Sequence, residues 1–391
     1  MEFRKRSLTN QIYLPSLFFS SAEGALLPIL PVTAVGYGLS LAEAGVVAAA
    51  LMVGTLLFEV PASWLTNRFG ERLTMLFGAL LGVGSSVLAF LNLGYLSLLL
   101  AALGFGAGHA FFGLARHSVI TEIVPAEHRP KSMSLLGGMF RGGMAIGPII
   151  GAAFISLYGV QAGYLSVSLL CLVTAALVFS VPAARFSTSE SGLDGNVWQV
   201  AKRHSRALLT LGVASAIISA GRTVRMVGLP LLAIQLSLDP AQTSFIFGIT
   251  GLIDFALFYL SGVVMDKYGK FWASVPTLVA LSITYLFSNM VTDEFSFWII
   301  AGVTALANAM SAGINMILGA EMAPQGSRSE FLAAFRLLTS GGVAFAPSLI
   351  SVLTALGGIS VALGVTGLIN LLGAYLFWKY LPIYAPDRSA N

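Results

Sequence analysis

The chain is poor in charged residues and contains a single cysteine. Only 10% of its 391 residues are Asp, Glu, Lys or Arg, whereas soluble domains carry about 25%. The lone Cys171 excludes an internal disulfide and a cysteine metal site. The four histidines show no metal-ligand spacing, and neither a nucleophile elbow nor a phosphate-binding glycine loop occurs. We therefore expect no enzymatic activity, no cofactor and no metal, and no direct use of ATP.

Long apolar runs dominate the chain instead, and hydrophobic residues make up 57% of it. A membrane-spanning helix needs about 20 apolar residues, so the length suits about a dozen spans. Lipid cannot satisfy open backbone groups, and every span must therefore be a helix. The predicted spans cover residues 12–36, 42–65, 73–92, 95–120, 132–157, 160–181, 207–235, 241–265, 272–291, 295–319, 329–354 and 359–381. The sequence thus predicts an all-α membrane protein with 12 transmembrane helices.

Residues that lie 199 positions apart match repeatedly, which indicates a tandem duplication. The matched pairs include Pro31 and Pro230, Gly70 and Gly269, Glu122 and Glu321, and Pro148 and Pro347. The polar stretch 183–206 separates the copies, so we expect a six-helix half over 1–182, a linker, and a second half over 207–391. Many secondary transporters are built from such repeats, with the binding site at the repeat interface.

The basic residues are unevenly distributed between the two sides of the predicted spans. Of the 21 Lys and Arg residues, 16 lie in the tails and in the loops that follow even-numbered spans. The positive-inside rule then places both termini in the cytoplasm. The net charge of +4 is therefore an orientation signal in a lipid bilayer, and we expect no nucleic-acid partner.

Two loops carry related motifs. The loop after span 8 holds Gly262, Asp266, Lys267, Gly269 and Lys270, and the loop after span 2 holds Ser63, Asn67, Arg68, Gly70 and Arg72. Both resemble the G-x-x-x-D-[RK]-x-G-[RK] motif of the major facilitator superfamily. We expect the acid to cap a neighbouring helix and the basic residues to bind cytoplasmic helix ends. The first copy departs from the motif, because Ser63 replaces the glycine and Asn67 replaces the acid.

Span 5 holds Gly143, Gly147, Pro148 and Gly151, which are similar to the G-x-x-x-G-P-x-x-G motif of antiporters in the same superfamily. Glycines at this spacing leave one helix face bare for close packing, and helix packing alone is the alternative interpretation. Span 4 lacks the arginine that drug antiporters of the superfamily carry before a glycine-rich run. The resemblance covers the whole chain and implies two pseudo-symmetric six-helix halves, the major facilitator fold. It also implies alternating access, with spans 1, 4, 7 and 10 lining a central cavity.

Several charged and polar side chains fall inside the spans, where they are costly and functional by default. Five are arginines, and at the offset of 199 Glu23 of span 1 matches Arg222 of span 7. His109 and Arg116 of span 4 match Asn308 and Asn315 of span 10, and each pair is spaced for one helix face.

These residues give the predicted site. The proton-coupling candidates are Glu23 and Asp254. The substrate-cavity candidates are Arg222, Arg225, Arg141, Arg336, His109, Asn308 and Asn315. The gate candidates, beside the two loop motifs, are Glu59, Arg116 and Glu122. The alternatives are a static ion pair of Glu23 with Arg222 or Arg225, neutralisation of a span 7 arginine by Asp254, and a packing role for His109.

We predict a monomeric secondary transporter of the inner membrane that exports a small amphipathic or anionic solute in exchange for protons. The alternative is an importer of an organic anion or a flippase of an anionic lipid. A non-transporting sensor or structural membrane protein is the third hypothesis, and the short linker disfavours it because it leaves no room for a signalling domain.

Overall fold

The structure is a computed structural model that describes residues 9–125, 128–180 and 197–386. These residues form helices and no strand. They divide into two compact units, which are described separately below. Unit 1 comprises Met1–Ser189 and Ser237–Phe255, and unit 2 comprises Glu190–Leu236 and Ala256–Asn391. Of the predicted linker, residues 183–196 lie outside the described residues.

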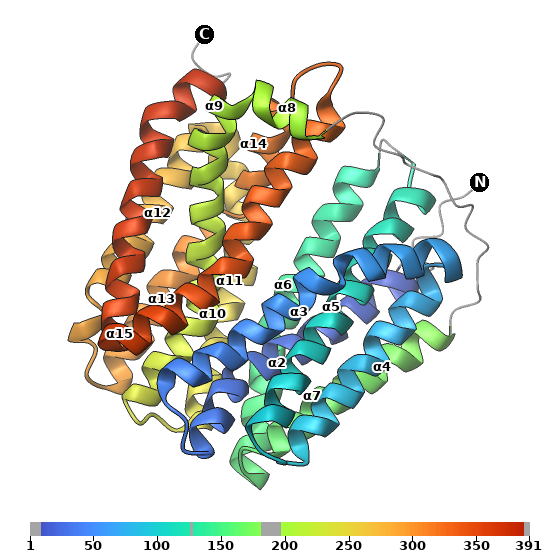
Figure 1. The fold of residues 1–391 in the computed structure, drawn as a ribbon, viewed down its shortest axis with the longest axis vertical. Helices are drawn as coiled ribbons and strands as arrows, with labels where there is room; N and C mark the ends of the chain where they lie inside the picture. The colour runs from blue at the N-terminus through green and yellow to red at the C-terminus, as the bar shows by residue number, and fades with distance from the viewer. Residues whose placement is uncertain (1–8, 126–127, 181–196, 387–391) are drawn as a thin grey trace. The chain divides into compact units, whose positions relative to one another are not determined.

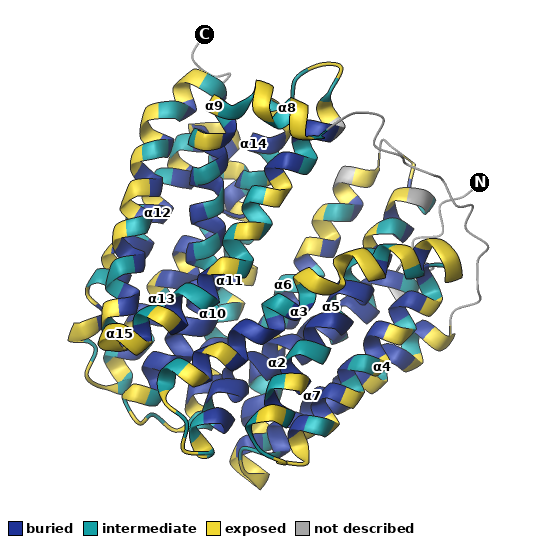
Figure 2. Cartoon of the chain, viewed as in Figure 1, coloured by how far each residue is buried: buried dark blue, intermediate teal, exposed yellow. Residues whose placement is uncertain are grey.

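Unit 1 is a bundle of long helices (Figure 1). Its elements are η1 (Thr9–Tyr13), α2 (Leu14–Gly36), α3 (Leu41–Phe69), α4 (Glu71–Phe90), α5 (Tyr95–Ile123), α6 (Arg129–Tyr158), α7 (Ala162–Ser180) and the first part of α11 (Pro240–Tyr268). Helix α2 packs against α6 and α7, while α5 packs against α3 and α4. Buried residues run along most of α2 (Figure 2), which therefore forms part of the core of this unit.

Unit 2 is also helical. Its elements are α8 (Val197–Arg203), α9 (Ser205–Ala207), η2 (Leu208–Gly212), α10 (Val213–Gln235), the second part of α11, α12 (Lys270–Leu286), η3 (Ser288–Met290), α13 (Glu294–Met310), α14 (Ile314–Met322) and α15 (Arg328–Tyr384). Helices α10 and α12 both pack against α15. At Gly358, where φ is 83°, α15 departs from helical geometry and joins two helices.

The predicted membrane spans are confirmed as helices. Ten helices among the described residues are long and apolar enough to cross a membrane by length and composition. The other two predicted spans are α12, which has 17 residues, and the part of α15 that follows Gly358.

The duplication is visible in the backbone. Helices α2 and α10 begin and end 199 positions apart, as do α3 and α11, and the π-helical turns η1 and η2 keep the same offset. Gly159, which ends α6, has a φ of 83°, and its equivalent is Gly358 of α15, with the same φ. A left-handed backbone favours glycine, and this explains why both copies keep glycine there.

One helix breaks the correspondence between the two copies. Helix α5 of unit 1 is continuous, but its counterpart in unit 2 is interrupted at residues 311–313 and forms α13 and α14. Gly313 precedes α14 in a left-handed conformation, with a φ of 82°. Breaks in membrane helices leave backbone groups to be satisfied by other partners, so this position is a candidate functional feature.

Glycines set the helix separations in unit 1. A Cβ added at Gly147 of α6 would lie 2.0 Å from the carbonyl oxygen of Ser21 on α2. A Cβ at Gly143, one turn earlier, would lie 2.5 Å from the carbonyl oxygen of Leu17. The glycine face predicted in span 5 therefore packs directly against the backbone of α2.

We predict that Gly147→Ala destabilises the protein and Gly137→Ala does not. Overpacking a close contact costs about 1–3 kcal/mol, whereas a Cβ at Gly137, also on α6, would meet nothing within 4 Å. The measurement is the apparent melting temperature of the two purified variants in detergent. Equal melting temperatures for both variants would show that the α2–α6 contact tolerates a methyl group.

Candidate functional site

Two of the predicted site residues meet in unit 1. Glu23 lies on α2 and is 5% exposed. The Nδ1 atom of His109, on α5, lies 2.9 Å from Glu23 Oε2, and the imidazole is partly exposed. A buried carboxylate must be paired or protonated, and histidine is the residue type that changes charge near neutral pH. The pair can therefore hold or release a proton inside the membrane helices.

Aromatic rings surround this pair. Phe19 of α2 stacks on Phe112 of α5, with ring centroids 4.4 Å apart and an interplanar angle of 11°. Arg116 lies over Phe112 at 5.8 Å and over Phe140 of α6 at 5.7 Å. The charge of Glu23 acts on the Arg116 guanidinium. Arg116, predicted as a gate residue, thus belongs to the same cluster as the Glu23–His109 pair.

Arg141 and Asp254 form a second buried ion pair in unit 1. Arg141 Nη1 of α6 lies 2.7 Å from Asp254 Oδ1 of α11, and Asp254 is 7% exposed. The two helices approach closely, since a Cβ at Gly251 would lie 2.9 Å from the Cα of Ala145. Asp254 therefore pairs with an arginine of span 5, and the sequence had suggested span 7.

In unit 2, Arg222 of α10 binds the break between α13 and α14. Its Nη2 donates to the carbonyl oxygen of Ser311 and, at 2.6 Å, to the Ser311 hydroxyl. The hydroxyl of Ser261 donates to the carbonyl oxygen of Ala312 at 2.7 Å. Both carbonyl groups lie at the interruption of the helix, so these side chains replace backbone partners there.

The predicted polar face of span 10 requires a correction. Asn308 is on α13 and Asn315 is on α14, so the break separates two residues that were expected on one continuous face. Asn315 Nδ2 instead donates to the hydroxyl of Ser219 on α10 at 2.8 Å. The physical reason is the left-handed turn at Gly313, which redirects the chain.

The remaining arginines of the spans differ in burial. Arg225 of α10 is 2% exposed, and its charge acts on Tyr285 of α12. The Tyr285 hydroxyl donates to the carbonyl oxygen of Gly221 at 2.8 Å. Arg336 of α15 is exposed. The structure therefore buries Arg225 within unit 2 and leaves Arg336 on its surface.

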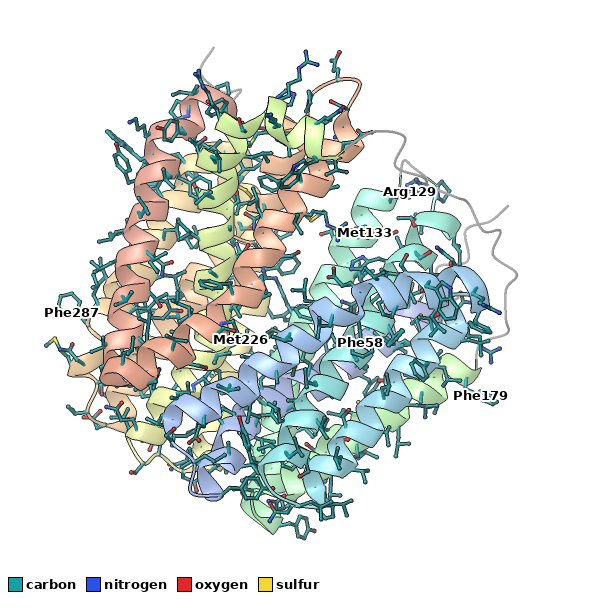
Figure 3. The ribbon with its side chains drawn as sticks, viewed as in Figure 1. Phe58, Arg129, Met133, Phe179, Met226 and Phe287 are labelled. Atoms are coloured by element: carbon teal, nitrogen blue, oxygen red, sulfur yellow. The ribbon has the colours of Figure 1, made fainter. Side chains whose placement is uncertain are left out.

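Two basic residues of the loop motifs bind helix ends. Arg72 donates to the carbonyl oxygens of Val178 and Phe179 at the end of α7, where Figure 3 labels Phe179. Lys270 Nζ lies 2.6 Å from Glu321 Oε2 on α14. A cation at a helix C-terminus is stabilised by the helix dipole, as expected for this motif.

Other motif residues lie at the surface. Asn67, Arg68, Asp266 and Lys267 are exposed, and Ser63 and Gly262 are partly exposed. Glu59 of α3 is exposed, and it follows Phe58, which Figure 3 labels. Within the described part of the chain Asp266 caps no helix, in contrast to the expectation, because its side chain points outward. The side chain of Glu122 lies outside the described residues.

The acids of the loops that follow odd-numbered spans cap helices. Ser40 and Glu43 form a capping box at the start of α3. Asp239 accepts the backbone N–H of Gln242 at 3.0 Å. The backbone N–H of Ser296 donates to Asp293, and this hydrogen bond lowers the pKa of the Asp293 carboxyl. These acids therefore serve local helix structure rather than the site.

Sequence reasoning missed Ser311, Phe112 and Phe140. Phe112 and Ser311 are equivalent at the offset of 199. The replacement of a large ring by a polar residue between the two copies was the signal that could have identified them. Phe140 carried the same signal, because its equivalent at that offset is Thr339.

Comparisons with known proteins agree with this architecture. A sequence profile of the Major Facilitator Superfamily matches residues 12–221 and 211–391. An uncharacterized MFS-type transporter of Methanocaldococcus jannaschii is 20% identical over 323 residues, which cover 80% of this chain and 82% of that protein. The structure of a D-xylose–proton symporter has a TM-score of 0.74 at 18% identity, over 98% of each chain.

The structure of a POT family transporter in complex with a thioalcohol-conjugated peptide has a TM-score of 0.80 at 10% identity, over 97% of each chain. At these identities the two structures are informative about the fold. The predicted all-α major facilitator fold, with two pseudo-symmetric six-helix halves, is therefore confirmed.

We predict that Arg141→Gln destabilises the protein more than the double variant Arg141→Gln/Asp254→Asn. The single change leaves a buried carboxylate without its cation, which costs about 3–5 kcal/mol, whereas the double change removes both charges. Thermal unfolding of the purified variants measures the difference. Lys131→Gln, at an exposed position of the same helix, is the control. A double variant less stable than the single one would show that the lone carboxylate is not the cause of the loss in Arg141→Gln.

Proposed function

Because this chain belongs to the Major Facilitator Superfamily, we propose that it is a secondary active transporter coupled to protons through Glu23 and His109. The protein is a multi-pass integral membrane transporter of this family.

The observation that carries the proposal is the buried contact between Glu23 and His109 at 2.9 Å. An ionised carboxylate stays inside a membrane helix at low cost only while a hydrogen-bond partner or a cation is close. A helix movement that separates the two side chains favours a protonated carboxyl group. Protonation and conformation are then linked, as alternating access with proton coupling requires. The similar D-xylose–proton symporter supports this coupling by analogy.

Asp254 is the second candidate for proton coupling. Its partner Arg141 is a guanidinium, which stays charged in proteins. Protonation of Asp254 therefore requires the ion pair to separate, while the Glu23–His109 pair can take up a proton in place. We assign the primary coupling role to Glu23 for this reason.

The solute in this proposal is small and amphipathic or anionic. The glycine face of α6 against α2 matches the antiporter-like motif and favours export. The buried guanidinium groups of Arg116 and Arg225 favour the alternative, uptake of an organic anion or flipping of an anionic lipid. Each direction of transport thus has one supporting observation.

The membrane topology belongs to the same proposal. We place both termini in the cytoplasm and the protein in the inner membrane, as a monomer in the lipid bilayer. The exposed cluster Lys202, Arg203 and Arg206 after span 6 supports this orientation by the positive-inside rule. The halves 1–182 and 207–391, joined by the linker 183–206, would be the parts that move.

We predict that Glu23→Gln abolishes solute accumulation driven by a pH gradient but preserves exchange of solute for solute across the membrane. The amide cannot carry a proton, whereas exchange needs no net proton movement. Proteoliposomes with a panel of organic anions and lipophilic cations measure both processes: a trapped pH-sensitive dye reports proton-linked transport, and radiolabelled solute reports exchange.

Glu294→Gln, at the start of α13 and outside the site, is the matched control and should transport like the unaltered protein. Full gradient-driven transport by Glu23→Gln would remove Glu23 from the coupling role. The sign of the accumulation under an inward proton gradient distinguishes export from uptake.

A further inference from the structure

The Arg116 guanidinium has an unusual environment. Arg116 is 7% exposed and lies within α5. Within the described part of the chain it donates no hydrogen bond, and its Nε atom is fully buried without a partner. Its neighbours are the rings of Phe112 and Phe140 and the charge of Glu23. A guanidinium carries five N–H donors, and buried donors are almost always hydrogen-bonded, so this group is prepared for an acceptor that the protein does not supply.

The rings hold the guanidinium in one place. Phe112 is fully buried and stacks on Phe19, which in turn stacks on Phe105 at 5.6 Å. Phe140 lies edge-on to the His109 ring, with centroids 6.5 Å apart. Stacking on aromatic faces fixes the plane of an arginine without using its hydrogen-bond donors. The donors therefore remain directed to a ligand.

The same face of α5 has room for that ligand. Gly113 lies between His109 and Arg116, at the spacing that brings all three to one side of the helix. A Cβ added at Gly113 would meet only the His109 ring, at 3.8 Å, and no atom of a neighbouring helix within 4 Å. The surface over Gly113 is thus uncovered, with an imidazole at one end and a guanidinium at the other.

We propose that Arg116 binds the anionic group of the transported solute, an organic monoanion with an apolar or aromatic body that lies over Gly113. The planar guanidinium forms two parallel hydrogen bonds to a carboxylate. Phe140, which is partly exposed, contacts the apolar body. This inference rests on the proposed function for its coupling step, whereas binding of the anion does not depend on it.

The charges of the cluster determine how proton and anion interact. With Glu23 ionised and His109 neutral, the charges of Glu23 and Arg116 cancel. One proton on the Glu23–His109 pair gives the cluster a net charge of +1, which attracts an anion. Proton and anion therefore bind together, and an inward proton gradient drives uptake. The geometry thus favours the uptake alternative over export.

Among the described residues, the other helices that pack against α5 carry one more buried carboxylate. Glu71 of α4 accepts a hydrogen bond from the Ser118 hydroxyl of α5 at 3.0 Å, and the neighbouring Arg72 binds the end of α7. Helix α7 and the turn η1 carry no charged residue. On α6, Arg141 is paired with Asp254. The other charged residues of α3 and α6, all exposed, are Glu43, Glu59, Arg68, Arg129 and Lys131. On α5, His117 is exposed.

The test uses the full-length protein in nanodiscs and three carboxylates with their neutral amides: benzoate and benzamide, indole-3-acetate and indole-3-acetamide, octanoate and octanamide. At least one carboxylate should raise the melting temperature of the unaltered protein, and its amide should not. Arg116→Gln should weaken that carboxylate by about tenfold or more. Arg203→Gln, which removes an exposed arginine of α8, should bind like the unaltered protein.

Arg116→Lys keeps the charge but loses the bidentate geometry, so it should bind several-fold more weakly, and it carries the test if Arg116→Gln does not fold. Calorimetry in two buffers of different ionisation enthalpy at about pH 8 should show proton uptake with the anion, and none in Glu23→Gln. The proposal is wrong if no carboxylate binds, if amides bind equally, or if both Arg116 variants bind like the unaltered protein. If the anion proposal fails in this way, the proposed function can still hold. It would hold if the protein transported another solute along a proton gradient and Glu23→Gln lost that transport.

Discussion

A carboxylate and an imidazole meet inside the helices of unit 1, and the chemistry of the site depends on the cost of keeping them there. Glu23 is almost fully buried on α2, and His109 of α5 is its hydrogen-bond partner. The close packing of α6 on the backbone of α2, which Gly143 and Gly147 permit, limits where this pair can move. A shift of α5 against α2 would separate Glu23 from His109 and leave a buried carboxylate without its hydrogen-bond partner.

The two copies share their helix pattern and differ in side-chain chemistry at one pair of equivalent positions. Phe112 and Ser311 occupy equivalent positions but have different structural roles. In unit 1 the Phe112 ring stacks on Phe19 and supports Arg116 within a continuous helix. In unit 2 the helix is interrupted, and Ser311 offers its carbonyl group and hydroxyl to Arg222. Unit 1 therefore places a guanidinium over aromatic rings, while unit 2 uses one to stabilise a break.

Sequence reasoning predicted the fold well because its signals are long and repetitive. Apolar length gave the spans, and the offset of 199 gave helix bounds that recur in both copies. The partners of charged residues were not predictable, because helix packing decides which side chains meet. The same holds for the break in span 10. Gly113 of α5 stays helical, whereas Gly313 is left-handed at the interruption, so glycine alone does not determine where a helix ends. Arg116 was predicted as a gate residue because it lies one to two helical turns from Glu122, whereas the contribution of Glu23, far away in the sequence, depends on how α2 packs against α5.

The most direct test of the central claim is the nitrogen NMR spectrum of histidine-labelled protein in nanodiscs. The chain has four histidines, and the resonance lost in His109→Gln identifies His109. We predict that the His109 ring-nitrogen resonances shift in Glu23→Gln, because that change removes the carboxylate next to Nδ1. Identical His109 ring-nitrogen resonances in the unaltered protein and in Glu23→Gln would contradict this pairing.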